Sequence, residues 1–452
     1  MTGFLSQLSS FVWGLPLIIL LIGTGLFLTI RLKGIQFSGF REGLKVLRGV
    51  YDNPDDPGEI SHFRALSTAL SATIGTGNII GVSVAVLAGG PGAVFWMWIT
   101  ACVGMATKFT SCTLAVHFRK IDQDGEAHGG PMHFIEIGMG SSYKWLAVCF
   151  AVFTALASFG IGNMFQINSM VSAVNTLLFK EVVEPGIALR LVVGVFTAAI
   201  VASVILGGIK RIAHVAGVLV PFMCAVYIGT GIVILVKNAH LVLPGLQLIF
   251  EQAFHAPESV SGGLLGGVIR SGVARGLFSN EAGLGSAPIA HGAARTKEPV
   301  REGLVAMLGP FIDTLMVCSI TGLVVVCMKT YETVQVKGIL TSVAFDQGLS
   351  GAGYIVSFSV ILFAFTTLIG WSYYGDRAVD YLFGKSYVPV YKWIYVGFVI
   401  IGALNPLEDV INLCDALNGL MAIPNLIALI VLAPLVADLT RKYMIRVKSS
   451  GK

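Results

Sequence analysis

The sequence predicts an all-α integral membrane protein of about eleven transmembrane helices, on the basis of its composition, its apolar stretches and its charge distribution. Of the 452 residues, 55% are hydrophobic and 12% are charged, and the mean hydropathy is +0.81. Soluble globular proteins carry about twice that share of charged residues. Surface-to-volume scaling leaves no room to bury so much apolar surface in one water-soluble core. A lipid bilayer is therefore the expected solvent and partner of this chain.

Eleven apolar stretches approach the length of about 20 residues that a spanning helix needs. They lie at 11–30, 63–88, 93–118, 145–170, 188–206, 212–236, 261–286, 303–328, 354–375, 388–405 and 417–437. The first has no basic segment before it, so we expect a retained span and not a cleavable signal peptide. The seventh is the least regular, since it is rich in glycine and contains Arg270, Arg275 and Glu281.

The basic residues are distributed unevenly between the two sides of the membrane. With the N-terminus outside, 22 of the 30 Lys and Arg residues fall in connections and a tail that face the cytoplasm, five fall outside and three lie within spans. This asymmetry follows the positive-inside rule and predicts an outer N-terminus and a cytoplasmic C-terminus. Because the basic residues form neither a stripe nor an arm, the net charge of +5 does not indicate a nucleic-acid partner.

The spans after the first divide into two halves of almost equal length. Five spans per half is an odd number, so the second half enters the membrane in the opposite sense to the first, as in transporters built from inverted repeats. The expected organisation is an N-terminal helix with a basic cytoplasmic loop (1–62), a first repeat (63–236), an extracellular connection (237–260), a second repeat (261–437) and a basic cytoplasmic tail (438–452).

The first span of each half is interrupted by glycine and small polar residues. The interruptions read SATIGTGN at 71–78 and GLFSNEAGLGS at 276–286. Glycine costs about 1 kcal/mol relative to alanine inside a helix, and lipid does not satisfy the polar groups of an unwound turn. Such a turn persists where it lines a cavity or binds a ligand. The alternative is that the glycines only allow close helix packing, but their occurrence at matching places in both halves favours a binding site.

Five motifs resemble signature sequences of the alanine or glycine:cation symporter family, also called the sodium:alanine symporters. They are GGPGAVFWMW at 89–98, SATIGTGN at 71–78, FGIGNMFQIN at 159–168, LFSNEAGLGSAP at 277–288 and LIGWSYYGD at 368–376. The resemblance implies the amino acid–polyamine–organocation superfamily and a leucine-transporter-like fold with two inverted five-helix repeats and an extra N-terminal helix. It also implies import of alanine, glycine or a close relative into a prokaryotic cell across the plasma membrane. Sodium, or in some members protons, would drive this import, and a monomer would suffice.

The resemblance also implies roles for individual residues. The backbone at Gly75, Thr76 and Gly77, with the side chains of Thr73 and Asn78, would bind the substrate carboxylate, and the groups around Phe278 and Ser279 would bind its ammonium. Gln166 would contact the polar end of the substrate, or else form a helix–helix hydrogen bond. Trp371 would close the side-chain pocket, or else lie in the aromatic belt at the membrane surface.

The co-transported sodium ion requires oxygen ligands, for which neutral groups suffice. The resemblance implies carbonyl groups near Ser71 and Ile74 and the hydroxyls of Thr366 and Thr367. Membrane-buried Thr hydroxyls also commonly bond back to the preceding turn.

Charged residues inside spans need partners, since each is costly in a membrane. Arg275 and Glu281 are close enough in sequence to pair, and Asp313 is a further partner for either. These groups either form a structural ion network or include a carboxyl, Glu281 or Asp313, that carries a coupling proton. The sequence contains no HExxH or GxSxG motif, and its two-fold organisation suits alternating access better than a continuous pore. An enzyme and a channel are therefore the less favoured classes.

Overall fold

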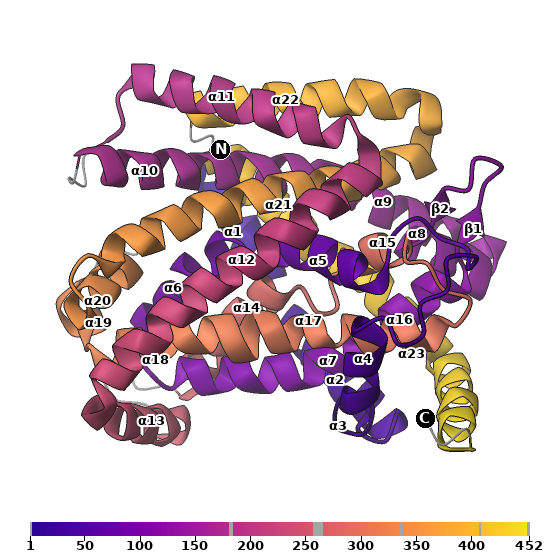
Figure 1. Cartoon of the computed structure of the whole chain (residues 1–452), viewed down its shortest axis with the longest axis horizontal. Helices are drawn as coiled ribbons and strands as arrows, with labels where there is room; N and C mark the ends of the chain where they lie inside the picture. The colour runs from indigo at the N-terminus through magenta and orange to yellow at the C-terminus, as the bar shows by residue number, and fades with distance from the viewer. Residues whose placement is uncertain are drawn as a thin grey trace.

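The computed structural model describes residues 2–179, 184–255, 265–334, 336, 338–405 and 408–449, and it is almost wholly helical (Figure 1). The main helices of the bundle are α1 (Thr2–Val12), α2 (Leu15–Arg31), α5 (His62–Thr73), α6 (Ile80–Gly89), α7 (Ala93–His117), α9 (Lys144–Phe159), α10 (Phe165–Phe179), α11 (Ile187–Ile205), α12 (Gly208–Lys237), α14 (Leu265–Asn280), α16 (Pro299–Ala306), α18 (Ser319–Cys327), α21 (Ala352–Phe383), α22 (Val388–Leu404) and α23 (Glu408–Ser449).

Further elements connect these helices. The connecting helices are α3 (Ile35–Ser38), α4 (Phe40–Leu47), α8 (Pro131–Phe134), α13 (Ala239–Phe254), α15 (Ala287–His291), α17 (Leu308–Pro310), α19 (Thr330–Thr333) and α20 (Leu340–Gly348). Segments of 3₁₀ or π geometry are η1 (Thr76–Asn78), η2 (Ile135–Met139), η3 (Ser141–Tyr143), η4 (Gly160–Met164), η6 (Phe311–Cys318) and η7 (Lys385–Tyr387). An antiparallel pair of strands, β1 (Lys120–Ile121) and β2 (Ala127–His128), forms a hairpin at one end of the bundle.

Nine helical segments of the described chain are long and apolar enough to cross a membrane, and the bent pair of α5 and α6 makes a tenth. The remaining expected span, 261–286, corresponds to α14, of which 16 residues are described. Its predicted first residues and the end of the 237–260 connection lie outside the described residues. The chain is thus a multi-pass membrane protein, and the count of eleven stays a prediction. The described part of the expected tail 438–452 is helical, since α23 continues to Ser449.

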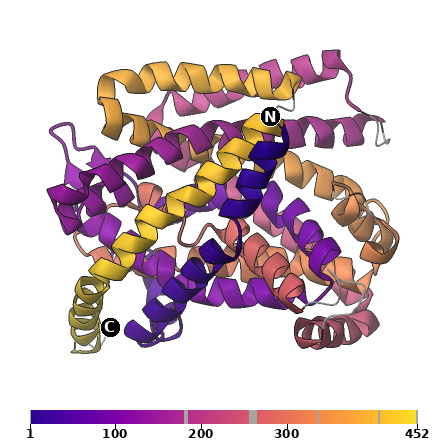
Figure 2. The ribbon, with the colours of Figure 1, turned by 180° about the vertical axis from the view of Figure 1, so that it is seen from behind.

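Large apolar side chains cover the outside of the bundle while polar ones occupy its interior. Phe11 is 77% exposed and Ile30 is 78% exposed, whereas Asn78, Thr314 and Asp313 are completely buried. This arrangement suits acyl chains as the surrounding solvent. Figure 2 shows α1 and α2 crossing the bundle beside α23, and α2 also packs on α7, so the extra N-terminal span contacts both halves of the chain.

A π turn lies within one long span, directly before α10. The segment Ser141–Phe179 forms one apolar span, longer than the predicted 145–170, and η4 lies in its middle. A Cβ atom on Gly162 would lie 2.3 Å from the Cβ of Trp371, so only glycine lets α21 approach this turn. The π turn, which often marks functional sites, thereby directs Gln166 toward the centre of the bundle.

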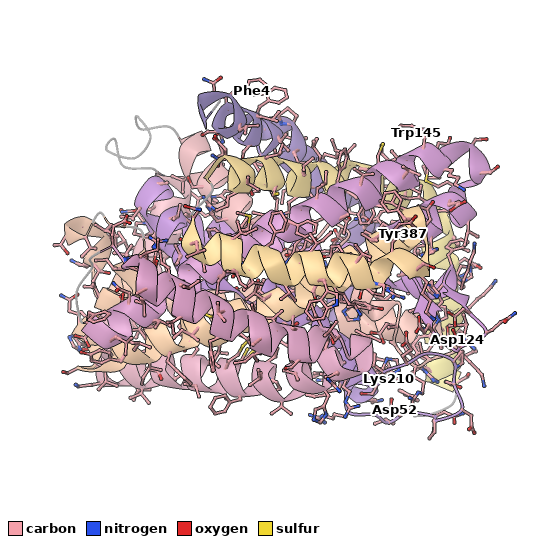
Figure 3. All side chains as sticks on the ribbon, turned by 90° about the horizontal axis from the view of Figure 1, so that it is seen from above. Phe4, Asp52, Asp124, Trp145, Lys210 and Tyr387 are labelled. Atoms are coloured by element: carbon pink, nitrogen blue, oxygen red, sulfur yellow. The ribbon has the colours of Figure 1, made fainter. Side chains whose placement is uncertain are left out.

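Charged side chains join the hairpin to the end of α21. Figure 3 shows Asp52, Asp124 and Lys210 at the same end of the bundle. His128 contacts Asp122 at 3.1 Å and Asp380 at 2.9 Å through its two ring nitrogens. Because both nitrogens donate only in the imidazolium form, this clasp requires a protonated His128.

We expect the hairpin to loosen as the pH rises. The hydrogen bond to Asp380 raises the pKa of His128 above its usual range. A raised pKa stabilises the folded state below the unfolded value of about 6.5 and ceases to do so as the pH rises through the folded pKa. Amide exchange of residues 120–128, corrected for its intrinsic pH dependence, should therefore accelerate above about pH 6.5. In the variant His128→Gln, the corrected exchange rate of these residues should be the same on both sides of about pH 6.5. A corrected rate in the wild type that does not change with pH would contradict the clasp.

Candidate functional site

The first break lies between α5 and α6, whose axes differ by 64°. The chain leaves helical geometry at Ile74 and Gly75 and forms the single turn η1 before α6 begins. The Gly75 N–H donates to the side-chain oxygen of Asn78 at 2.9 Å. Among the described residues, no acceptor is found for the N–H groups of Thr76 and Gly77. Free N–H groups at the start of a half-helix are suited to bind a carboxylate.

The second break separates α14 from α15. Glu281, Gly283 and Gly285 have positive φ angles of 52°, 95° and 94°, a region that glycine enters freely and other residues rarely adopt. The Ala282 N–H donates to Asn280 at 3.0 Å, and Asn425 of α23 donates to the Gly283 carbonyl at 2.8 Å. These side chains satisfy backbone groups that lipid would leave unpaired.

Asp313 connects the two breaks. It lies in the π turn η6 and is completely buried. Its carboxylate accepts hydrogen bonds from Asn78 in the first break at 2.6 Å and from Ser279 beside the second break at 2.9 Å. Thr314 donates to it as well, at 2.7 Å. A carboxylate with three donors from three elements holds the broken helices in one arrangement.

The predicted substrate residues of the two breaks face each other. A Cβ atom on Gly77 would lie 3.5 Å from the ring of Phe278, so these residues are in contact across the gap between the breaks. The Thr76 hydroxyl donates to the Gln166 side-chain oxygen at 3.3 Å. Gln166 thus forms the helix–helix hydrogen bond that was its alternative role, and this bond also places its amide against the first break.

Two predicted carboxylate ligands have internal partners. The Thr73 hydroxyl donates to the Ala69 carbonyl at 3.3 Å, within its own helix. The Asn78 amide is engaged by Gly75 and Asp313. Because the polar groups of a buried break must be hydrogen-bonded, these two side chains stabilise the shape of the break. The N–H groups of Thr76 and Gly77 are then the donors that a substrate carboxylate can use.

Trp371 lies beside the π turn η4 and faces the second break. It is completely buried, so the alternative of an aromatic belt at the membrane surface is wrong. Its side chain interacts with the Glu281 carboxylate, although the indole N–H does not meet the geometry of a full hydrogen bond.

The predicted cation ligands divide into two groups. A Cβ atom on Gly75 would lie 2.8 Å from the Thr367 hydroxyl, and one on Gly370 would lie 2.7 Å from the Ser71 hydroxyl. Thr367 and Ser71 therefore lie on the tight contact between α5 and α21, next to Ile74 at the end of α5. All three hydroxyls also bond back within their own helices, as the alternative role has it: Thr366 and Thr367 donate to the Phe363 carbonyl at 3.0 and 2.9 Å, and Ser71 donates to the Thr68 carbonyl at 2.7 Å. Thr366 differs from Thr367 in that its hydroxyl also faces Met223 of α12. Neutral hydroxyls beside a helix end, whose last carbonyls lack intrahelical donors, are suitable ligands for a monovalent cation.

The buried charges are arranged differently from the pairing considered for Arg275 and Glu281. Glu281 accepts a hydrogen bond from Ser286 and interacts electrostatically with the buried Lys108, which also faces Asp313. Arg275 lies over the ring of Phe278, 5.6 Å from its centroid, and faces away from Glu281. That pairing is wrong because Glu281 leaves the helix in a left-handed turn that reverses its direction.

A further buried cluster joins the opposite ends of the broken helices. The Glu302 carboxylate contacts both His62 at the start of α5 and His291 at the end of α15. All three side chains are at most 1% exposed. The sequence analysis did not identify this cluster, although a glutamate at the start of an apolar span is an available signal.

The sequence model of the sodium:alanine symporter family matches residues 1–452. An uncharacterised transporter of Haemophilus influenzae is 46% identical over 98% of this chain and 96% of its own length. The sodium/alanine symporter AgcS of Methanococcus maripaludis is 45% identical over 97% of this chain and 96% of its own length.

Among solved structures, that of MhsT in complex with L-phenylalanine has a TM-score of 0.59 at 13% identity, over 85% of this chain and 98% of that one. This likeness confirms the leucine-transporter-like fold that the motifs implied. The chain therefore belongs to the sodium:alanine symporter family, and it is a secondary transporter rather than an enzyme.

Proposed function

We propose that this protein imports a small neutral amino acid, alanine or glycine, together with sodium by alternating access. The observation that carries the proposal is the facing pair of breaks, in which the free N–H groups of Thr76 and Gly77 lie next to Phe278. The amino-acid carboxylate would bind these N–H groups, and groups near Phe278 and Ser279 would bind the ammonium. Gln166 and Trp371 would bound the remaining space, so that only a small side chain fits.

The proposed direction of transport rests on the predicted orientation of the chain in the membrane. With the N-terminus outside and the C-terminus in the cytoplasm, the cluster of Glu302 with His62 and His291 lies on the inner side of the breaks. Phe278 lies on their outer side, where it is half-buried. For inward transport, the Phe278 side chain would move aside first, and the cluster of Glu302 with His62 and His291 would separate second. Ten core spans make a monomer sufficient for this cycle.

Sodium would bind where α5 and α21 meet. Ser71 and Thr367 supply hydroxyls there, and the end of α5 near Ile74 supplies carbonyls. Because this site shares the first break with the substrate carboxylate, each ligand stabilises the arrangement that the other binds, which gives positive coupling.

Uptake of radiolabelled alanine by proteoliposomes tests the proposal. An inward sodium gradient should drive accumulation that excess unlabelled glycine inhibits, and a potassium gradient should not. Accumulation driven by a proton gradient without sodium would support the alternative of proton coupling, which the buried Asp313 at both breaks favours. Equilibration without accumulation would indicate a channel.

Two adjacent threonines provide a matched test of the sodium site. Thr367→Val should raise the sodium concentration for half-maximal uptake about 10-fold, since it removes one hydroxyl ligand of a charged group. Thr366→Val removes the same hydroxyl on the side that faces Met223 and should change this concentration less than about two-fold. Equal effects of the two variants, measured as sodium dependence of the initial uptake rate, would contradict the assignment.

A further inference from the structure

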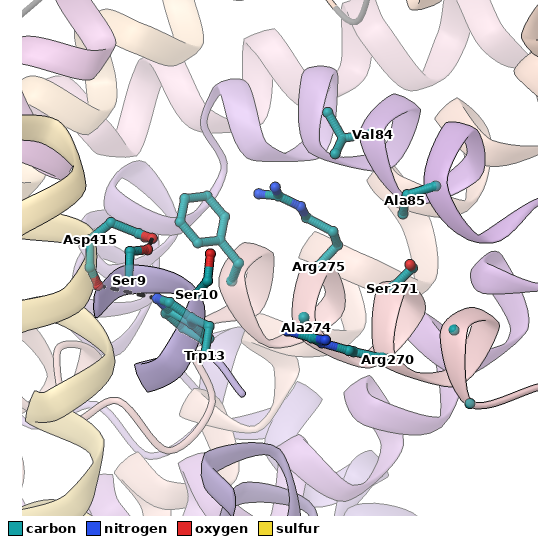
Figure 4. Close-up of a pocket in the computed structure, with 14 residues that line it drawn as sticks. Ser9, Ser10, Trp13, Val84, Ala85, Arg270, Ser271, Ala274, Arg275 and Asp415 are labelled. Atoms are coloured by element: carbon teal, nitrogen blue, oxygen red, sulfur yellow. Dashed lines mark hydrogen bonds between the residues drawn. The ribbon is translucent and has the colours of Figure 1, made fainter. Parts of the chain in front are cut away.

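The described chain has a pocket beside the breaks and another at the far end of the extra N-terminal span. Figure 4 shows the first, with Arg275 of α14 on one side and Trp13 and Asp415 on the other. The second has a volume of about 620 Å³ and lies between the end of α2, the short helix α3 and the last turns of α23. Figure 2 shows these ends of α2 (indigo) and α23 (yellow) next to each other at one corner of the bundle. With the predicted orientation of the chain, this corner is on the cytoplasmic side.

Three basic side chains line the second pocket without an acidic partner. Arg31, Lys33 and Lys448 form no ion pair with any described residue. Asp438 is the one carboxylate among the described residues that line the pocket, and it pairs with Arg441 at 2.7 Å. The pocket therefore has an excess of positive charge that the chain itself does not neutralise.

The backbone at the end of α2 holds one of these cations in an unusual conformation. The Gly34 N–H donates to the Thr29 carbonyl at 2.8 Å, and the Lys33 N–H donates to the Ile30 carbonyl at 3.1 Å. This pair of bonds is the Schellman motif, whose left-handed position is usually a glycine. Lys33 occupies that position, with a φ angle of 54°. Because a lysine is less stable than a glycine there, its presence at the pocket indicates a role for the side chain.

Apolar side chains lie beside the three cations. Leu32, Ile35, Met444 and Ile445 line the pocket. Ile445 is exposed, and so is Ile30 in the last turn of α2. A ligand that matches this pocket combines a negatively charged group with an apolar body, and the volume of the pocket is within the range of small-molecule sites.

We infer that this pocket binds the head group of one anionic phospholipid from the cytoplasmic leaflet. The lipid phosphate accepts hydrogen bonds from Arg31, Lys33 and Lys448, which are suitable phosphate ligands, and the acyl chains lie along the apolar side chains of α2 and α23. Anionic lipids of this leaflet attract basic side chains at its surface. The bound lipid joins the extra N-terminal span to the last span of the second repeat.

The composition of the pocket favours this ligand over two others. A zwitterionic phospholipid would place its ammonium where Asp438 is already paired. A free phosphate would leave the apolar side chains of the pocket uncovered. The inference does not depend on which substrate the protein transports.

Native mass spectrometry of the purified full chain in detergent tests this site. The protein is titrated with phosphatidylglycerol, or with phosphatidylethanolamine that carries the same acyl chains. We expect the first phosphatidylglycerol to bind the wild type at least about 10-fold more tightly than phosphatidylethanolamine, because three cations favour the anionic lipid.

Lys33→Gly should weaken phosphatidylglycerol binding about five-fold and leave phosphatidylethanolamine binding unchanged, since one cation is lost. Glycine adopts the left-handed conformation at this position freely. The variant should therefore melt at the wild-type temperature or above it, which separates a loss of lipid binding from a loss of folding.

Arg41→Gln is the matched control, because Arg41 is an exposed cation of the nearby helix α4 that does not line the pocket. It should change the affinity for phosphatidylglycerol less than about two-fold. Equal affinities of the wild type for the two lipids, or equal effects of Lys33→Gly and Arg41→Gln, would overturn the inference. Displacement of phosphatidylglycerol by a large excess of glycerol phosphate would show a site for a soluble phosphate and would overturn it as well.

Discussion

Asp313→Asn is expected to reduce sodium-driven alanine uptake by about 100-fold or more, because removing one member of a buried charged network costs about 3–5 kcal/mol. The Asp313 carboxylate accepts hydrogen bonds from Asn78, Ser279 and Thr314. An asparagine offers one acceptor oxygen in place of two and presents an N–H₂ group to donors. It also removes a negative charge that faces Lys108. Both breaks would lose their common partner.

Initial uptake rates in proteoliposomes, together with the melting temperature of the purified protein, measure this effect. Thr314→Val is the control, since it removes one donor and leaves the charge, and it should cost less than about 10-fold in rate. A folded Asp313→Asn protein with low uptake would assign the loss to the site. A wild-type rate in Asp313→Asn would show that Asp313 does not hold the breaks in their working arrangement.

Glu302→Gln is expected to release the inner ends of both broken helices. Glu302 is completely buried between His62 and His291, and the neutral amide can no longer accept from two positively polarised rings. Since one partner of a buried charged set is lost, opening of this end should become easier by about 3 kcal/mol. Amide exchange of α5 and α15 should accelerate about 100-fold.

The control for this prediction is Glu298→Gln. Glu298 lies four residues earlier, and its side chain pairs with Arg446 near the surface. This variant should leave the exchange of α5 and α15 unchanged. If Glu302→Gln leaves the exchange of both helices at the wild-type rate, the cluster does not restrain the inner end of the bundle.

The broken helices were predictable because their signal is local. Glycine and asparagine in an apolar span disfavour a continuous helix wherever they occur, and both breaks are found at Gly75–Asn78 and Glu281–Ser286. The opposition of Gly77 to Phe278 followed from the family motifs. Thr367 lies against Gly75, while the adjacent Thr366 faces Met223 because one residue of register turns a helix by a large angle. The sodium site itself stays a prediction.

The charged clusters were not predictable because they depend on contacts between distant segments. Asn78 and Asp313 are separated by 235 residues, and His62 and Glu302 by 240. Sequence spacing suggested that Arg275 pairs with Glu281, but the left-handed conformation at Glu281 directs the two side chains apart. The π turns η4 and η6, which set Gln166 and Asp313 at the centre, likewise have no local motif and arise from packing.

Coupled flux is the central claim of this account, and dual-isotope uptake measures it most directly. Proteoliposomes with the wild-type protein are given radioactive sodium and radiolabelled alanine together, and the initial entry of both is followed. The account predicts that alanine accelerates sodium entry, that sodium accelerates alanine entry, and that the two enter at a fixed ratio over a range of concentrations. Sodium entry at the same rate with and without alanine would contradict symport by this protein.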